Sequence, residues 1–387
     1  MKKLVQGLLM LFLCMILTGC WDRNEVKDLA LVMATGIDKS EQGGIRVTDQ
    51  IAVPSAVGGG QLGGGSKEQK SFVIESAEGK DISDASQKLQ DRLPRLLYSA
   101  HRRILIIGEE QARDGIQDIL DTYSRDTRNR LRNLIVVAKG DTAESVLQSK
   151  TILEQIPGQE LKKLQDRDFG TKTTMLEFLN EMATEGIVPI AGGIEKRTSG
   201  DQKYWLSSTA VFKHGKLVGY LDEEETRGLL WVKGKIQHAY VTADNLPNNK
   251  GTVSMYVTSA SSHIRYAVTG RTITFNIDLT GQGEIVENTA NLDFRREKSL
   301  SMVNKELNKA VMSYATACID TAQKDLKADV FGLGEEIYRN NPRLWHEIGP
   351  RWDERFPDVK VYVHVHLNAM GPGTTGGPIR SEGEAGG

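Results

Sequence analysis

The residues near the N-terminus whose side chains could do chemistry are two of the chain's three cysteines, Cys14 and Cys20. Cys20 follows an aliphatic residue and two small ones, Leu17-Thr18-Gly19, directly after an apolar run. A cysteine thiol can form a disulfide, hold a metal, act as a nucleophile or accept a lipid. The third cysteine, Cys318, falls on the apolar face of a predicted helix, which indicates a core thiol.

The first 19 residues have the pattern of an export signal. Lys2 and Lys3 precede an almost wholly apolar run at 4–17, which is shorter than the roughly 20 residues of a membrane span. The run ends in Leu-Thr-Gly-Cys, which resembles a bacterial lipobox. The resemblance implies cleavage before Cys20 and its conversion to an N-palmitoyl, S-diacylglycerol cysteine. Cys14 would leave with the signal peptide, residues 1–19.

Other candidate groups indicate no catalysis. His364 and His366 lie two apart on a predicted strand and so share a face, but no third metal ligand accompanies them. The adjacent acids 223–225 point in different directions around a predicted helix, which is typical of a solvated first turn. No Gly-x-Ser-x-Gly or His-Glu-x-x-His motif occurs. We therefore expect no catalytic residue, no metal site and no cofactor.

The charge balance gives no reason to expect a nucleic-acid partner. The 387 residues include 49 Lys or Arg and 51 Asp or Glu, a net charge of −2. The densest basic patch is Arg125-Asp126 with Arg128, Arg130 and Arg132. It lacks interleaved aromatic residues, so we interpret it as structural ion pairs or a protein contact.

Residues 20–197 are predicted to form an N-terminal α/β domain with a mixed sheet. Runs such as 104–107 are apolar throughout, as in strands buried on both faces, and helical patterns alternate with them. The Gly-rich stretch 57–66 predicts a mobile loop, and it lacks the Gly-Lys-Ser/Thr ending of a phosphate loop. Asp141 with Glu144 predicts a capping box at one helix start.

A break in the pattern near 198–202 predicts a domain boundary. Residues 203–286 are predicted to form a small, mostly antiparallel α+β middle domain that begins with a hairpin about His214-Gly215. Residues 287–370 are predicted to form a C-terminal domain, in which one long amphipathic helix packs on a sheet.

The tail, 371–387, is rich in Gly and Pro and is predicted to be disordered. The fold class expected for the whole chain is therefore multi-domain α+β and α/β.

Several stretches go further than composition and spacing. They are Cys20-Trp-Asp-Arg-Asn-Glu-Val, Gly36-Ile-Asp38, Tyr98-Ser-Ala-His101, residues 104–108, Arg125-Asp126 with Arg130, residues 211–231, Gly332-Leu-Gly334, Trp345, Trp352 and Phe356-Pro-Asp358. Together, and in this order, they resemble the Ger(x)C family, the C subunits of spore germinant receptors. Arg128 departs from the family pattern, which has an acid between the two arginines, so a salt bridge at that point is in question.

The resemblance implies a receptor of three kinds of subunit on the spore inner membrane: a channel-like A subunit, a transporter-like B subunit with the germinant pocket, and this lipoprotein. The C subunit would lie on the outer face, held by lipid on Cys20, and act when nutrients trigger ion release. A scaffold or coupling role is our first expectation. Two alternatives are a solute-binding lipoprotein that itself binds the germinant and a cell-envelope enzyme.

Residues 211–231 are the most specific internal signature of that family. We expect this segment to carry a surface for the A and B subunits. The residues expected on it are Phe212, Lys216, Tyr220, Glu224, Arg227 and Trp231.

Overall fold

The structure is a computed structural model that describes residues 3, 6–7, 26–53, 71–149, 154, 156–165, 170–197, 204–244, 246, 251–270 and 272–370. Five predictions fall outside these residues. They concern the signal peptide, the lipid on Cys20, the Gly-rich loop 57–66, the boundary at 198–202 and the tail 371–387. These remain predictions.

The first sheet has a parallel centre and antiparallel edges, and its strand order is β3-β2-β1-β5-β6-β7-β8-β9, with β4 beside β1. Strands β1, β5, β6 and β7 pair in parallel, which confirms the mixed sheet. The strands are β1 (Leu29–Lys39), β2 (Ile45–Ala52), β3 (Phe72–Gly79), β4 (Leu96–Tyr98), β5 (Ile104–Gly108), β6 (Leu134–Lys139), β7 (Ile190–Lys196), β8 (Tyr204–Lys213) and β9 (Lys216–Leu221).

Helices cover both faces of this sheet, which is why its central strands are apolar throughout. In β5, Leu105 and Ile107 pack toward α2, α3, α4 and α7, while Ile104 and Ile106 pack toward α5 and α6. Gly115, with φ of 141°, ends α3, and α4 begins two residues later. The helices are α2 (Ile82–Arg92), α3 (Glu109–Asp114), α4 (Gln117–Arg125), α5 (Ala143–Leu147), α6 (Pro157–Gln165) and α7 (Met175–Ala183).

Strands β8 and β9 form the predicted hairpin, but they do not belong to a separate middle unit. β8 pairs antiparallel with β7, and β9 pairs with β8, so both complete the first sheet. The pairing of the first sheet therefore continues past the boundary predicted at 198–202, and the boundary itself stays a prediction. Period and turn residues identify a strand, whereas its partner depends on contacts remote in sequence.

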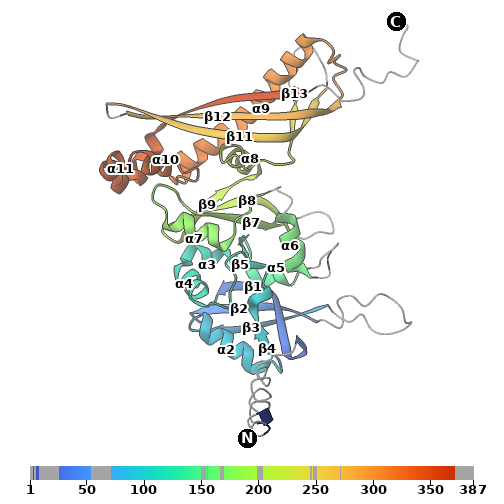
Figure 1. Cartoon of the computed structure of the whole chain (residues 1–387), viewed down its shortest axis with the longest axis vertical. Coiled ribbons are helices and arrows are strands. Elements are labelled where there is room, and N and C mark those ends of the chain that lie inside the picture. The colour runs from blue at the N-terminus through green and yellow to red at the C-terminus, as the bar shows by residue number, and fades with distance from the viewer. Residues whose placement is uncertain are drawn as a thin grey trace, which may run out of the picture.

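The second sheet has the order β10-β11-β12-β13 and carries the long helix α9 (Figure 1). Strands β10 to β12 are antiparallel, as expected, whereas β13 joins β12 in parallel. The sheet thus draws strands from both segments that the sequence divided near residue 287, because β13 returns to β12. The elements are β10 (Tyr240–Ala243), β11 (Val253–Thr269), β12 (Thr272–Asn288), β13 (Lys360–Met370) and α9 (Glu297–Asp320).

Helix α9 confirms the predicted long helix, and it ends in a π turn, η3 (Thr321–Asp325). Short helices follow it and pack around Trp345 and Trp352, which are 5% and 4% exposed. None of the helices in the described part of the chain is long and apolar enough to cross a membrane. The remaining elements are η1 (Val26–Asp28), η2 (Ser99–His101), α8 (Glu223–Val232), α10 (Leu333–Asn340), α11 (Pro342–Ile348), η4 (Gly349–Arg351), α12 (Trp352–Arg355) and η5 (Phe356–Asp358).

Candidate functional site

One continuous segment, residues 204–233, ties the two sheets together, and we call it the linkage segment. It supplies β8 and β9 to the first sheet and then α8, which packs on α9 of the second unit (Figure 1). Asp222 caps α8 by accepting a hydrogen bond from the Glu225 N–H at 2.9 Å. The Glu225 carboxylate accepts from the Asp222 N–H at 2.8 Å, which completes a capping box. The helix that spans the two units therefore begins at a fixed residue.

The approach of α8 to α9 depends on Gly228. A Cβ added at this position would lie 2.1 Å from the carbonyl oxygen of Tyr314 and 2.9 Å from the Cβ of Cys318. Since backbone cannot move aside as a side chain can, only glycine permits this helix spacing. The signature segment 211–231 therefore owes one of its glycines to the contact between the two units.

Cys318 lies under this crossing and is fully buried. Burial raises the pKa of its thiol well above the ordinary value, and the nearby carboxylates of Glu225 and Asp222 raise it further. A thiol held neutral in this way is a poor nucleophile. The interpretation of Cys318 as a core residue is confirmed.

Two lysines of the linkage segment bond across to the rest of the protein. Lys233 Nζ lies 2.8 Å from Glu181 Oε1 of α7, and the two side chains are 10% and 18% exposed. At the hairpin turn, Lys213 Nζ donates to the carbonyl of Lys327 at 2.9 Å and lies 3.1 Å from Asp353 Oδ2. The linkage segment is therefore held by ionic contacts at both of its turns as well as by packing.

A second contact between the units is built around Asp329, a buried carboxylate that the sequence analysis did not single out. Its Oδ1 accepts N–H bonds from Phe331, Gly332 and Leu333 at 2.9–3.2 Å, and its Oδ2 accepts from Gly334 at 2.8 Å and from Trp352 Nε1 at 3.0 Å. Burial raises the pKa of Asp329 to about 6, although these donors oppose the shift. The signal available in the sequence was an Asp shortly before Gly332-Leu-Gly334, where a tight turn brings several N–H groups to one acceptor.

Residues 185–188 of the first unit dock onto this turn, and we call the contact the Asp329 junction. The Val188 N–H donates to the Asp329 carbonyl at 2.9 Å, and the Glu335 N–H donates to the Gly186 carbonyl at 3.0 Å. Gly186 has φ of 81°, and a Cβ there would come within 2.3 Å of the Gly334 backbone. The Trp345 indole N–H donates to Glu185. The junction thus gathers Gly334, Trp345 and Trp352 from separate family-like stretches, beside a cleft of about 670 Å³.

The expected partner surface is only partly at the surface. Phe212 is 0% exposed and packs edge-to-face on Phe178 with ring centroids 5.1 Å apart, and Trp231 is 2% exposed. Both belong to the core, so their placement on a contact surface is wrong. Phe212 lies on the face of β8 that points into the core, and Trp231 lies on the buried face of α8.

The remaining members of that surface do reach solvent. Lys216, Glu224 and Arg227 are exposed, and Tyr220 is half-buried. The Tyr220 hydroxyl donates to Glu109 at 3.1 Å, and Arg227 pairs with Glu223 at 2.5 Å. The backbone therefore presents a smaller, mixed-charge surface than the sequence suggested.

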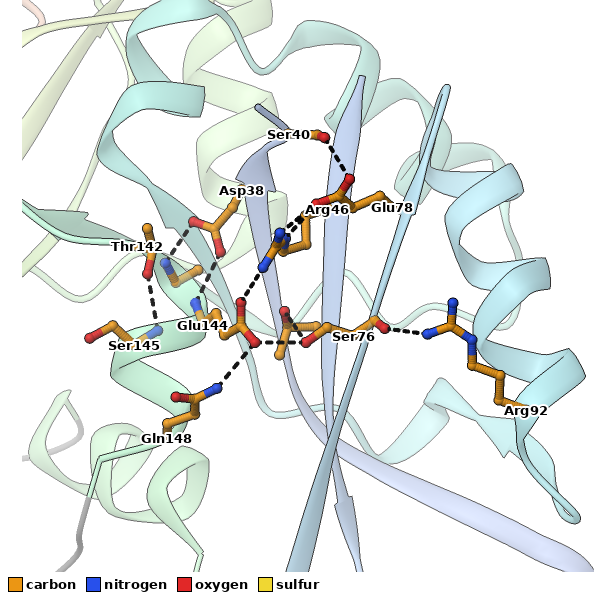
Figure 2. Close-up of polar contacts among 12 residues, drawn as sticks. Asp38, Ser40, Arg46, Ser76, Glu78, Arg92, Thr142, Glu144, Ser145 and Gln148 are labelled. Atoms are coloured by element: carbon orange, nitrogen blue, oxygen red, sulfur yellow. Dashed lines mark hydrogen bonds and ion pairs between the residues drawn. The ribbon is translucent and has the colours of Figure 1, made fainter. Parts of the chain in front are cut away.

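A polar cluster joins β1, β2 and β3 to α5 (Figure 2). Arg46 lies at its centre and donates to Glu78 at 3.1 Å and to Glu144 at 2.9 Å. Ser76 donates to Glu144 at 3.0 Å, and Ser40 donates to Glu78 at 3.0 Å. The hydrogen bond from Arg46 lowers the pKa of Glu78. Each carboxylate is thus engaged with a structural partner, and the cluster braces α5 against the sheet.

The start of α5 differs from the predicted capping box. Thr142, not Asp141, is the N-cap and accepts from the Ser145 N–H at 3.1 Å. Asp38 of β1 accepts from the N–H groups of Ala143 and Glu144 at 2.7 and 3.0 Å (Figure 2). Glu144 is thereby free to face Arg46. A cap supplied from a strand more than a hundred residues away leaves no local pattern to find.

Two arginines of the basic patch form ion pairs, one of the two interpretations given above. Arg125 lies 2.6 Å from Asp121, and Arg128 lies 2.9 Å from Asp126. Arg128, which departs from the family pattern, therefore has its own carboxylate partner.

The two histidines His364 and His366 lie on the same face of a strand, as their spacing of two residues predicts. His364 and His366 are both exposed on one face of β13. No group of three or more His, Cys, Asp or Glu side chains placed to hold a metal ion occurs among the residues that the structure describes.

Comparison with known proteins agrees with this two-unit arrangement. Residues 22–196 match the family described as "Spore germination protein N-terminal domain", and residues 207–373 match "Spore germination B3/ GerAC like, C-terminal". "Putative spore germination protein YfkR" of Bacillus subtilis (strain 168) is 30% identical over 369 residues, covering 94% of this chain and 95% of the relative. "Spore germination protein KC" of the same strain is 28% identical and covers 98% of both chains.

A solved structure supports the fold. The crystal structure of the GerBC protein aligns with a TM-score of 0.57 and 18% identity, covering 87% of this chain and 96% of that chain. The two family matches define a protein of the spore germination class. The chain belongs to the Ger(x)C family, whose two domain models together span most of it. The second model begins inside β8, so the C-terminal family domain completes the N-terminal sheet.

Proposed function

We propose that this chain is the lipid-anchored C subunit of a nutrient germinant receptor on the outer face of the spore inner membrane. It acts there with membrane A and B subunits, as a scaffold that couples them. Family membership over both halves of the chain supports the role in germination. The lipobox-like Leu17-Thr18-Gly19-Cys20 supports attachment by lipid.

One structural observation supports a scaffold over an enzyme: the two units are fixed to each other twice. The linkage segment joins them through Gly228 and Lys233, and the Asp329 junction joins them again through Gly186. A body held at two separate contacts resists a hinge motion about either one. Such a body holds attached subunits in a fixed geometry, and it transmits a displacement from one end to the other.

The test of the anchor is Cys20→Ala in spores. Germination would be measured against nutrient, with membrane levels of all three receptor proteins recorded. We expect this protein to leave the membrane and the response to fall with it. Cys318→Ala is the matched control, because it removes a thiol that is buried and accepts no lipid. Normal germination with the Cys20→Ala protein still in the membrane would refute the proposed role of the lipid.

The test of the contact surface is charge reversal at exposed residues of the linkage segment. Lys216→Glu and Glu224→Lys alter the surface without touching the core. If the segment binds a receptor subunit, these changes lower co-purification of that subunit while leaving thermal stability unchanged. Reversal at Lys305, an exposed residue of α9, is the control. Equal co-purification of all the variants would exclude the surface.

A second function, binding of a solute by this chain itself, is favoured by one feature. A cavity of about 370 Å³ lies between β8, α8 and the approach to β10, and its walls include Trp205, Trp231, Tyr240 and Tyr314. Ligand that binds only the native state raises its apparent stability. Thermal unfolding with added amino acids or sugars therefore tests this function, with Tyr240→Ala as the variant that should abolish any shift. No shift with any nutrient that triggers the spores would exclude it.

A further inference from the structure

The end of the molecule where β1 begins carries an exposed patch of apolar and cationic side chains. We call it the β4 patch; its residues are Lys27, Arg92, Arg95, Leu96, Tyr98 and Arg103. β4 pairs in parallel with the first residues of β1, so that Leu96 lies opposite Leu29 and Tyr98 opposite Leu31. Strand β4 and helix α2 occupy this same end (Figure 1). The patch therefore lies beside the point where the chain enters the fold.

Arg95 and Arg103 of the patch have exposed side chains, whereas Arg92 donates to the Ser76 carbonyl at 3.0 Å. Leu96 is 49% exposed and Tyr98 is 37% exposed, although both belong to a strand. The guanidinium groups of Arg95 and Arg103 make no ion pair within the described part of the chain. An apolar residue, a tyrosine and arginines on one small surface favour an occupant that is both apolar and anionic.

The chain length fixes how far this patch can lie from a lipid on Cys20. Val26, where η1 begins, lies six residue steps after Cys20. Fully extended, they span about 20 Å, at roughly 3.5 Å per residue. An anchor at Cys20 therefore keeps the start of β1, and with it β4, next to the bilayer surface.

We propose that the β4 patch docks on the anionic surface of the lipid bilayer and sets the orientation of the protein on the membrane. This inference rests on the proposed lipid attachment at Cys20. Leu96 enters the boundary between headgroups and acyl chains, Tyr98 lies at the headgroup level, and Arg95 and Arg103 bind lipid phosphates. A lipid anchor alone lets a protein swing freely, whereas a second contact fixes which end faces away from the membrane. The second sheet is then held at the far end of the molecule.

The test uses the lipidated mature protein in phospholipid vesicles that contain a nitroxide-labelled quencher lipid. Leu96→Cys would carry a fluorophore; Cys318 is buried and Cys20 would carry the lipid, so the label goes to the new thiol. Val286→Cys on β12 is the matched control, because that residue is 54% exposed and belongs to the second sheet. Co-flotation with the vesicles reports on the lipid anchor, and quenching reports on the patch.

We expect the Leu96→Cys label to be quenched, and more strongly when phosphatidylglycerol is added to phosphatidylcholine. Arg95→Glu with Arg103→Glu should reduce the docked population by at least about fivefold for each cation removed. Protein that floats but shows equal quenching at both labelled positions overturns the β4 patch and leaves the anchor standing. Protein that does not float overturns both. Quenching of the Leu96→Cys label that occurs only in membranes that also hold the A and B subunits overturns the patch as a lipid surface.

Discussion

The sharpest consequence of the structure is that Gly228 sets the distance between the two units. In Gly228→Ala, the new Cβ would lie 2.1 Å from the Tyr314 carbonyl oxygen and 2.6 Å from its carbonyl carbon. An ordinary contact is about 3.5 Å. Helices α8 and α9 would therefore have to separate by more than about 1 Å, because the obstructing atoms are backbone.

The size of the effect follows from two opposing terms. Overpacking a tightly packed contact costs about 1–3 kcal/mol, whereas replacing a helical glycine by alanine gains about 1 kcal/mol of helix propensity. The clash is with backbone, so we place its cost at the upper end. The expected net loss is about 2 kcal/mol in the free energy of unfolding, which corresponds to about 4–8 °C in Tm.

Gly219→Ala is the matched control for this substitution. Its Cβ would meet the end of the Leu326 side chain at 2.5 Å, and the next atom lies 4.0 Å away. A flexible side chain can rotate out of the way. We therefore expect Gly219→Ala to unfold within about 0.5 kcal/mol of the unsubstituted protein, the range of substitutions that disturb no special feature.

Two measurements on the same samples check the reasoning. Thermal unfolding gives the loss of stability, and the rate at which a thiol reagent modifies Cys318 reports on the helix crossing, because this thiol lies against Gly228. In Gly228→Ala, both should change, with earlier unfolding and faster modification. An unchanged Tm together with an unreactive Cys318 would show that the crossing adjusts without strain and would refute the argument.

Three further predictions concern charge. Burial raises the folded-state pKa of Asp329 from 3.8 to about 6, so the stability that this group contributes is fully present below pH about 4 and is lost as the pH rises through 6. Relative to Asp329→Asn, the free energy of unfolding should fall by about 3 kcal/mol across that window. A difference between the two proteins that stays constant with pH would contradict this prediction. Lys233→Met should cost about 3 kcal/mol or more, because it strands the largely buried Glu181; a double variant with Glu181→Leu should recover much of the loss in urea unfolding, and additive losses would exclude the pair. Arg46→Ala should cost only about 1 kcal/mol, since this side chain is 37% exposed; a loss several times larger would mean that the cluster holds more than α5.

Local patterns predict most elements of this fold because they depend on neighbouring residues. The all-apolar run at 104–107 requires a strand covered on both faces, and the structure covers it on both. The long helix α9 follows from apolar residues at helical spacing, which also places Cys318 in the core. Two-residue alternation puts His364 and His366 on one face of β13.

The features that the sequence did not predict are those that depend on a distant partner. β8 and β9 join the first sheet, and β13 crosses back to β12, because strand pairing carries no local signal. Phe212 and Trp231 turn inward, since the face of an element is chosen by what packs on it. The cap from Asp38 and the turn around Asp329 were likewise invisible, because their donors and acceptors meet only after folding.

The sequence by itself determined the elements, the lipobox-like start and the family resemblance, because each of these depends on residues that are close together in the chain. Only the tertiary structure decided that the most family-like segment, 211–231, links the two sheets, with Gly228 against a backbone carbonyl and with Phe212 and Trp231 in the core. The physical reason is that burial and close approach are properties of pairs of segments. A residue's type limits what it can contact, but the fold chooses the contact.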